Sequence, residues 1–157
     1  MISESTFLLL VSILLLTRMC AFADWPAFLG GVERDAVATD VPLKWTPESG
    51  IVWSTPLPGH GQSSPVQVAN RVYVTAIEGP QKENNLVLAI DLKTGNELWQ
   101  YRGTSSLQVK NDVYTSRAAP TPVADDSGVY AFFESGNTVA LDLDGGVRWQ
   151  RSLIDDY

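Results

Sequence analysis

The sequence predicts an all-β protein made of four-stranded antiparallel units, and three observations support this prediction. After residue 23, no stretch keeps a 3.6-residue apolar period for three turns, which argues against helices. Short alternating apolar runs are separated by turn residues such as Thr94-Gly95 and Gly145-Gly146. Similar segments end in a tryptophan at positions 46 and then 50 residues apart, namely Trp53, Trp99 and Trp149.

Each repeat is expected to contain a strand, a tight turn, a strand, a loop, a strand, a glycine turn and a strand. Two β-branched and aromatic runs, 66–69 and 71–76, flank Asn70, a residue that tolerates a left-handed backbone. A period near 50 residues is typical of β-propeller blades, which are four-stranded sheets. We therefore predict a partial β-propeller of about two four-stranded antiparallel blades plus an outer strand around Trp53.

The segment 89–99 fits the pattern A-x-D-x-x-T-G-x-x-x-W, which is the signature of PQQ-like, or quinoprotein-type, propeller repeats. The sequence therefore resembles this family. A second copy is one residue shorter and has no threonine in its turn. The residues 24–31, DWPAFLGG, also resemble the mature start of exported bacterial members, with Leu29 where those proteins carry arginine. The residues that match the pattern are Ala89, Asp91, Thr94, Gly95 and Trp99 in the first copy and Ala140, Asp142, Gly146 and Trp149 in the second.

The resemblance implies structural roles for these residues. In this family the tryptophan lies on the outer strand and packs on the glycine turn of a neighbouring blade, because glycine lets the indole approach the backbone. The aspartate accepts hydrogen bonds from backbone N–H groups of its turn. Trp53, Trp99 and Trp149, with Gly95 and Gly146, are therefore expected to join adjacent blades.

The sequence of residues 1–23 is typical of a signal peptide, and residues 24–157 are expected to form the propeller repeats. The apolar run 7–16 is shorter than the ~20 residues of a membrane span, and Ala21-Phe22-Ala23 is a small-x-small cleavage site. No lysine or arginine precedes the apolar run, which leaves an uncleaved membrane anchor as the alternative. We expect a periplasmic or secreted protein with no membrane span after cleavage.

Composition excludes several classes of site. The net charge is −7, with 18 acidic and 11 basic residues, and no basic stripe is present, so we expect no nucleic-acid partner. The single cysteine, Cys20, falls within the signal peptide, and Arg18 and Met19 before it make a poor lipidation site. With one cysteine and one histidine, His60, the chain cannot form a disulfide framework or a Cys- or His-rich metal site.

The remaining candidates for chemistry are weak. His60 lies near Ser63 and Ser64, but the sequence shows no G-x-S-x-G motif, and proximity in the sequence indicates neither an orienting carboxylate nor an oxyanion hole. The pairs Asp125-Asp126 and Asp155-Asp156 are typical of solvated turns, and the segment 142–146 lacks the spaced acids of a calcium loop. We therefore expect no catalytic, cofactor-binding or metal-binding residue.

Two functions follow from the resemblance. We favour an exported, non-enzymatic scaffold without a cofactor, whose partners are other proteins or further propeller blades. The alternative is the N-terminal fragment of a PQQ-dependent quinoprotein dehydrogenase, which would need a closed eight-bladed ring, calcium and an aspartate base. Closed propellers have at least ~4 blades. The chain is therefore expected to be a piece of a larger propeller, or else to complete a ring with other chains; a non-functional gene remnant is a third possibility.

Overall fold

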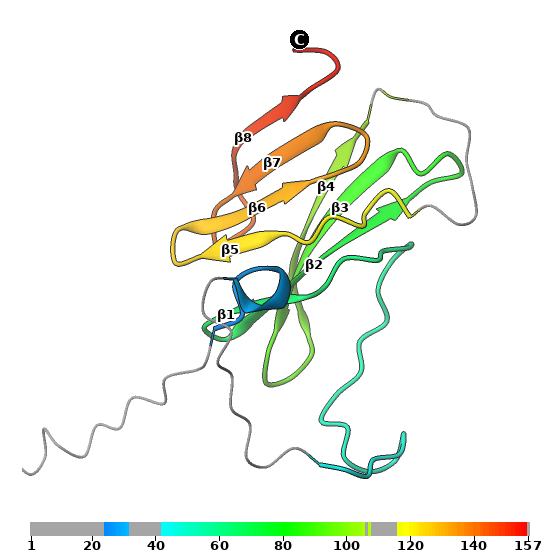
Figure 1. Cartoon of the computed structure of the whole chain (residues 1–157), viewed down its shortest axis with the longest axis vertical. Coiled ribbons are helices and arrows are strands. Elements are labelled where there is room, and N and C mark those ends of the chain that lie inside the picture. Colours follow the sequence, from blue (N-terminus) through cyan, green and yellow to red (C-terminus); the bar gives the residue numbers. More distant parts are fainter. Residues whose placement is uncertain (1–23, 32–41, 106, 108–115, 157) are drawn as a thin grey trace, which may run out of the picture.

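The computed structural model describes residues 24–31, 42–105, 107 and 116–156, and the predicted signal peptide lies outside them. The described chain forms two four-stranded antiparallel sheets and one short 3-10 turn, η1 (Phe28–Gly30). Figure 1 shows the two sheets side by side, with β8 at the far edge. The predicted all-β fold, a partial propeller of four-stranded blades, is confirmed. In the part of the chain described, no helix has the length and apolarity needed to cross a bilayer.

Each sheet is one blade, with its strands in chain order from the inner to the outer edge. The middle strands of blade 1 are buried on both faces, which explains their nearly continuous Val, Leu, Ile and Ala content. Blade 1 consists of β1 (Val66–Val68), β2 (Arg71–Glu78), β3 (Asn84–Asp91) and β4 (Glu97–Thr104). Blade 2 consists of β5 (Val123–Asp125), β6 (Gly128–Phe132), β7 (Asn137–Leu141) and β8 (Val147–Ser152).

The two blades repeat the same register residue by residue. In both, the alanine of the sequence motif lies directly opposite the motif tryptophan, and the ladder shifts immediately after that pair. This shift leaves one extra residue on each outer strand, Leu98 on β4 and Arg148 on β8. Equivalent rows across the blades are Val66, Tyr73, Ala89 and Trp99 in blade 1 and Val123, Tyr130, Ala140 and Trp149 in blade 2.

The main apolar core lies between the blades. One face of blade 1 packs on one face of blade 2, and Trp99 and Tyr101 border this cluster. A smaller cluster covers the other face of blade 1 beneath Trp53. The main cluster contains Val66, Val68, Tyr73, Ile77, Val87, Ala89, Ala118, Ala124, Val129, Ala131, Phe133, Val139 and Leu141.

The segment 24–26 ties the inner edges of the two blades together. Trp25 exchanges two backbone hydrogen bonds of 2.8 Å with Gln67 on β1. The carbonyl of Pro26 accepts a 2.9 Å bond from the backbone N–H of Ala124 on β5. These bonds satisfy edge groups of both inner strands, which would otherwise face solvent.

The outer strand predicted around Trp53 is not formed in the described chain. Residues 51–57 are assigned to no strand, and the bridge at Thr46–Ser49 precedes them. A strand exists only where a neighbouring strand exchanges ladder hydrogen bonds with it. None of the described strands pairs with this segment, and side-chain hydrogen bonds from Trp53 and Thr55 join it to blade 1.

The turn between β1 and β2 also differs from the expectation. The residue with the left-handed backbone is Ala69, at φ +51°, rather than Asn70. Asn70 instead uses its side chain, whose Nδ2 donates a 2.6 Å hydrogen bond to Asp91 Oδ2. The exposed Ala69 therefore carries the conformational strain of this turn.

Ala69→Gly is expected to raise the free energy of unfolding by about 0.5 kcal/mol. Glycine removes the cost of a left-handed backbone at alanine, which is about 1–2 kcal/mol. Part of this gain is lost, because glycine also raises the conformational entropy of the unfolded chain. Ala69→Val should destabilise the protein, because a branched side chain fits this backbone poorly. Urea denaturation of both variants checks the prediction, and equal destabilisation by both would contradict it.

Candidate functional site

The joint between the blades is built around the indole of Trp99. Trp99 lies on β4 of blade 1, and its Nε1 donates a 2.8 Å hydrogen bond to the carbonyl of Leu143 in the β7–β8 turn of blade 2. The ring rests on Gly145 of the same turn, where a Cβ atom would lie 2.8 Å from Trp99 Cδ2. Gly145 has φ +88°. Both the close approach and the backbone conformation therefore require glycine.

This geometry corrects the assignment of Gly146. The turn from Asp142 to Gly145 is one residue shorter than the turn from Asp91 to Gly95, so the second glycine of the pair takes a different role. Gly146 donates its backbone N–H to Asp142 Oδ1 at 2.8 Å, and its φ is not positive. The glycine beneath the indole is therefore Gly145.

Trp53 makes the same joint on the other side of blade 1. Its Nε1 donates a 2.8 Å hydrogen bond to the carbonyl of Leu92, and its ring rests on Gly95, at φ +72°. A Cβ atom on Gly95 would lie 2.7 Å from Trp53 Cδ2. The hydroxyl of Thr55 also donates to the Gly95 carbonyl.

The motif aspartates organise the two glycine turns. Asp91 Oδ1 accepts hydrogen bonds from the backbone N–H groups of Lys93 and Thr94 and from the Thr94 hydroxyl, at 3.0, 2.8 and 2.9 Å. Asp142 Oδ1 accepts from the backbone N–H groups of Asp144 and Gly146, at 2.9 and 2.8 Å. Each carboxylate thus holds its turn in the shape on which an indole rests.

The melting temperature is expected to depend on pH through Asp91. The bonds from Thr94 hold the pKa of Asp91 below its ordinary value of 3.8. A folded-state pKa below the unfolded value stabilises the protein above the unfolded pKa, and this contribution is lost as pH falls through the folded pKa. The melting temperature of Asp91→Asn should therefore lie below that of the wild type at pH 7, with a gap that narrows below about pH 4. Thr94→Ala should show the same trend with a smaller amplitude, whereas a pH-independent gap would contradict this role.

A polar contact accompanies the Trp99 joint. Arg71 on β2 donates a hydrogen bond to the Leu143 carbonyl, which also accepts from Trp99. The second guanidinium nitrogen lies 3.4 Å from Asp144 Oδ1. Burial raises the pKa of the neighbouring Tyr73, and the Arg71 charge partly opposes this rise. None of these polar residues was predicted from the sequence, although Tyr73 and Tyr130 recur at matching positions of the repeat.

Trp149 occupies the place on blade 2 that Trp99 occupies on blade 1, but no glycine turn of the described chain lies against it. Its ring packs against Tyr130, with centroids 6.4 Å apart and planes at 42°. Trp99 and Tyr73 form the matching pair, at 5.9 Å and 41°. The Trp149 residue remains 41% exposed.

The segment around His60 continues the line of β1 along β2. His60 exchanges backbone hydrogen bonds with Ile77, at 2.9 and 2.7 Å. A Cβ atom on Gly59 would lie 2.1 Å from the Ile77 carbonyl oxygen, so this glycine permits the close passage. The hydroxyl of Ser63 hydrogen-bonds to the backbone of Thr75. Ser63 is thus bonded to the sheet rather than to His60.

The paired acids act within their own turns. Asp125 Oδ1 accepts from the hydroxyl and backbone N–H of Ser127 and from the backbone N–H of Gly128, and these bonds lower the pKa of Asp125. Asp156 Oδ2 accepts from the backbone N–H of Ser152, while the backbone N–H of Asp155 donates to the Ser152 hydroxyl. Among the described residues, no three His, Cys, Asp or Glu side chains gather as a metal site would require.

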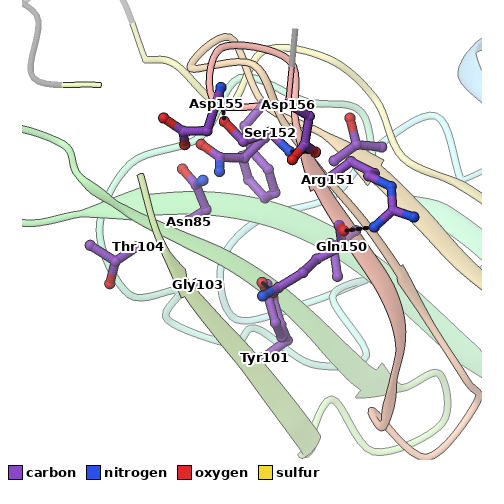
Figure 2. Close-up of a pocket in the computed structure, with 13 residues that line it drawn as sticks. Asn85, Tyr101, Gly103, Thr104, Gln150, Arg151, Ser152, Asp155 and Asp156 are labelled. Carbon is purple, nitrogen blue, oxygen red and sulfur yellow. Dashed lines mark hydrogen bonds between the residues drawn. The ribbon is translucent and has the colours of Figure 1, made fainter. Parts of the chain in front are cut away.

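A polar cavity of about 340 Å³ lies between the outer strands of the two blades (Figure 2). Tyr101 on β4 and Gln150 on β8 face each other there, with the hydroxyl 3.3 Å from Gln150 Oε1. At its inner end, the buried Asn85 donates to Ser135 at 3.4 Å and leaves its Oδ1 without a partner. The cavity is suited to water or a small polar group rather than to an apolar ligand.

The family model described as outer membrane protein assembly factor BamB matches residues 36–156. The chain belongs to the BamB family. The BamB of Moranella endobia (strain PCIT) is 33% identical over 115 residues, which cover 73% of this chain and 27% of that protein. The chain therefore spans about a quarter of the length of this BamB relative.

Two solved structures resemble the BamB-family chain more distantly. A europium-containing methanol dehydrogenase matches 64% of this chain and 17% of its own, with 20% identity and a TM-score of 0.44. The quinohemoprotein alcohol dehydrogenase from Comamonas testosteroni matches 62% and 14%, with 23% identity and a TM-score of 0.42. Likenesses this distant assign no activity to the BamB-family chain.

The motif side chains of the two joints are already engaged within the chain. The indoles of Trp53 and Trp99 rest on Gly95 and Gly145, and Arg71 is committed to the Leu143 carbonyl. The motif side chains are thus engaged in holding the blades together.

Proposed function

We propose that this chain is the blade-bearing part of an exported, non-enzymatic scaffold that binds other proteins during outer membrane protein assembly. The observation that carries the proposal is the match of residues 36–156 to the BamB family. The structure supports it because the motif groups that could serve chemistry, including the Asp91 carboxylate and the Trp99 N–H, are bonded within or between the blades. The groups left for a function are those on the surface of the protein, where other proteins can bind.

Exposed apolar side chains at the outer edge of blade 2 supply the surface for binding proteins. Val147 on β8 is 51% exposed, and Leu153 and Ile154, which follow this strand, are each 50% exposed. Exposed apolar groups of this kind can serve as contact sites for other proteins. The protein is further proposed to reach the periplasm through residues 1–23, which act as a signal peptide.

Site-specific photo-crosslinking in bacteria tests the proposed function. A photoreactive amino acid at Val147 or Leu153 is expected to crosslink to outer membrane proteins or to their assembly machinery, and the same group at exposed Lys44 serves as the control. Crosslinks confined to cytoplasmic proteins would contradict both export and the scaffold role. Dye-linked alcohol oxidation after addition of PQQ and calcium would contradict the scaffold function and support the dehydrogenase alternative.

A further inference from the structure

The two blades present the same row of side chains, but within the described chain a neighbouring blade packs against the row of blade 1 alone. On blade 2, Ala140 is itself buried, whereas Val123 and Trp149 are exposed. On blade 1 the row of Val66, Tyr73, Ala89 and Trp99 packs against blade 2, and Val66 is 0% exposed. On blade 2 the equivalent row forms what we name the free face, where Val123 is 49% exposed. The covered row therefore shows what kind of surface fits the free one. The free face consists of Val123, Tyr130, Ala140 and Trp149.

Each blade has an arginine on this face, but at a different position of the repeat. Blade 1 has Arg71 at the start of β2 and Leu98 at the extra position of β4, whereas blade 2 has Gly128 and Arg148 at the corresponding positions. A Cβ atom on Gly128 would lie 2.2 Å from the Leu141 carbonyl oxygen and 3.5 Å from Arg148 Nη1. The Arg148 guanidinium thus lies beside the position from which a side chain at 128 would extend.

The surroundings of the two guanidinium groups also correspond. Arg71 lies beside Tyr73, whose pKa it lowers against the effect of burial. Arg148 Nη1 lies 3.3 Å from the Tyr130 hydroxyl and donates to the Ser127 carbonyl at 3.4 Å. Each blade therefore carries one guanidinium next to its tyrosine on the same face.

The occupied joint shows what such a guanidinium recognises. Arg71 binds the Leu143 carbonyl, which precedes Gly145 in the turn beneath Trp99, and pairs with the Asp144 side chain. At the other joint, Val52 precedes Trp53, and the turn carries Lys93 and Thr94 between Leu92 and Gly95, where the second turn carries Asp144. The acidic turn residue of this chain is thus the one that faces an arginine.

We propose that Arg148 is a specificity-determining residue of the free face. Arg148 takes the role that Arg71 has in the occupied joint. It selects a further blade of this repeat type, one whose glycine turn carries an acidic side chain at the position that corresponds to Asp144. This proposal goes beyond the scaffold function, because it depends only on the contacts between blades. A second copy of the chain does not supply the turn, since Trp53 and Trp99 already occupy Gly95 and Gly145.

Moving the arginine within the occupied joint tests the proposal in the native chain. Arg71→Gly removes the arginine of blade 1, and adding Leu98→Arg then gives blade 1 the arrangement of blade 2, with the guanidinium at the extra position of the outer strand. Asp144→Asn is expected to lower the melting temperature of the wild type by about 2 °C, as for a partly exposed ion pair. The loss of melting temperature caused by Asp144→Asn should vanish in the Arg71→Gly background. It should return in the Arg71→Gly/Leu98→Arg background, but not in the Arg71→Gly/Leu98→Gln background.

If Asp144→Asn has no effect in the Arg71→Gly/Leu98→Arg background, an arginine at the outer-strand position does not reach the turn, and the proposal fails. The free face itself provides a second measurement that is independent of Arg71→Gly. In a chain with residues 105–156 repeated after Ser152, the new turn should cover Trp149 and shift its indole N–H resonance. Asp144→Asn in the added copy should weaken docking about two- to fivefold, and Asp144→Lys in that copy should weaken it more strongly.

Two controls complete this second measurement. In the repeated chain, Arg148→Gln should remove the preference for aspartate over asparagine, whereas Lys44→Gln, which removes the same charge outside the blades, should preserve it. An unchanged preference in Arg148→Gln would overturn the proposal. Sedimentation of the unmodified chain should show a monomer at micromolar concentration. A dimer that Trp149→Ala dissociates would show that a second copy occupies the free face, contrary to the proposal.

Discussion

Trp99→Ala is expected to lower the free energy of unfolding by about 3–4 kcal/mol. The substitution removes a large aromatic side chain from the edge of the main core and opens a cavity over Gly145. It also removes the indole donor to the Leu143 carbonyl. Because this side chain joins the two blades, we further expect a less cooperative transition. Chemical denaturation followed by circular dichroism measures both effects.

Trp149→Ala is the matched control for this loss. The same residue type lies at the same register position of blade 2, but its ring contacts Tyr130 and no glycine turn of the described chain. We expect a cost of about 1 kcal/mol or less, since the residue is 41% exposed and leaves little cavity. Equal losses from Trp99→Ala and Trp149→Ala would show that contact with a neighbouring blade adds no stability.

Gly145→Ala is expected to cost about 2–4 kcal/mol. A Cβ atom there would lie 2.8 Å from the Trp99 ring, so the indole must move away from the turn. An L-residue at φ +88° adds a backbone cost of about 1–2 kcal/mol. Thermal unfolding monitored by tryptophan fluorescence should show both the loss of stability and a red-shifted emission from the displaced indole.

Gly136→Ala separates the two contributions. Gly136 has φ +84°, close to that of Gly145, but a Cβ atom there would be 3.4 Å from Ile154, an ordinary contact. This substitution should therefore carry the backbone cost of about 1–2 kcal/mol and leave the tryptophan emission unchanged. If Gly145→Ala were no more costly than Gly136→Ala, close approach of the indole would not be what requires glycine.

The fold was predictable from the sequence because its signals are local and repeat. The alternation of apolar residues and the glycine turns define strands and hairpins within each blade. The spacing of Trp53, Trp99 and Trp149 then sets the size of the repeat, and the structure has two four-stranded sheets of this size. The pattern also places Ala89 opposite Trp99 in the ladder, which accounts for a small residue at that motif position.

The details of the joint were less predictable because they depend on contacts between distant segments. Aligning the shorter second turn by its residue types points to Gly146, whereas the backbone places Gly145 under the indole. The ion pair of Arg71 with Asp144 spans 73 positions and forms only when the blades pack. Likewise, the segment around Trp53 has the sequence of an outer strand, but strand formation requires a neighbouring strand, and none of the described strands pairs with this segment.

The most direct test of the joint between the blades is the proton chemical shift of Gly145 in solution. Close packing under the Trp99 ring predicts that the Gly145 Hα resonances move upfield by ring-current shielding. In Trp99→Leu they should return to ordinary glycine values, while those of Gly146 change little. If the Gly145 resonances lie at ordinary values in the wild type, or if only Gly146 responds to Trp99→Leu, the indole does not rest on this turn and the proposed joint is wrong.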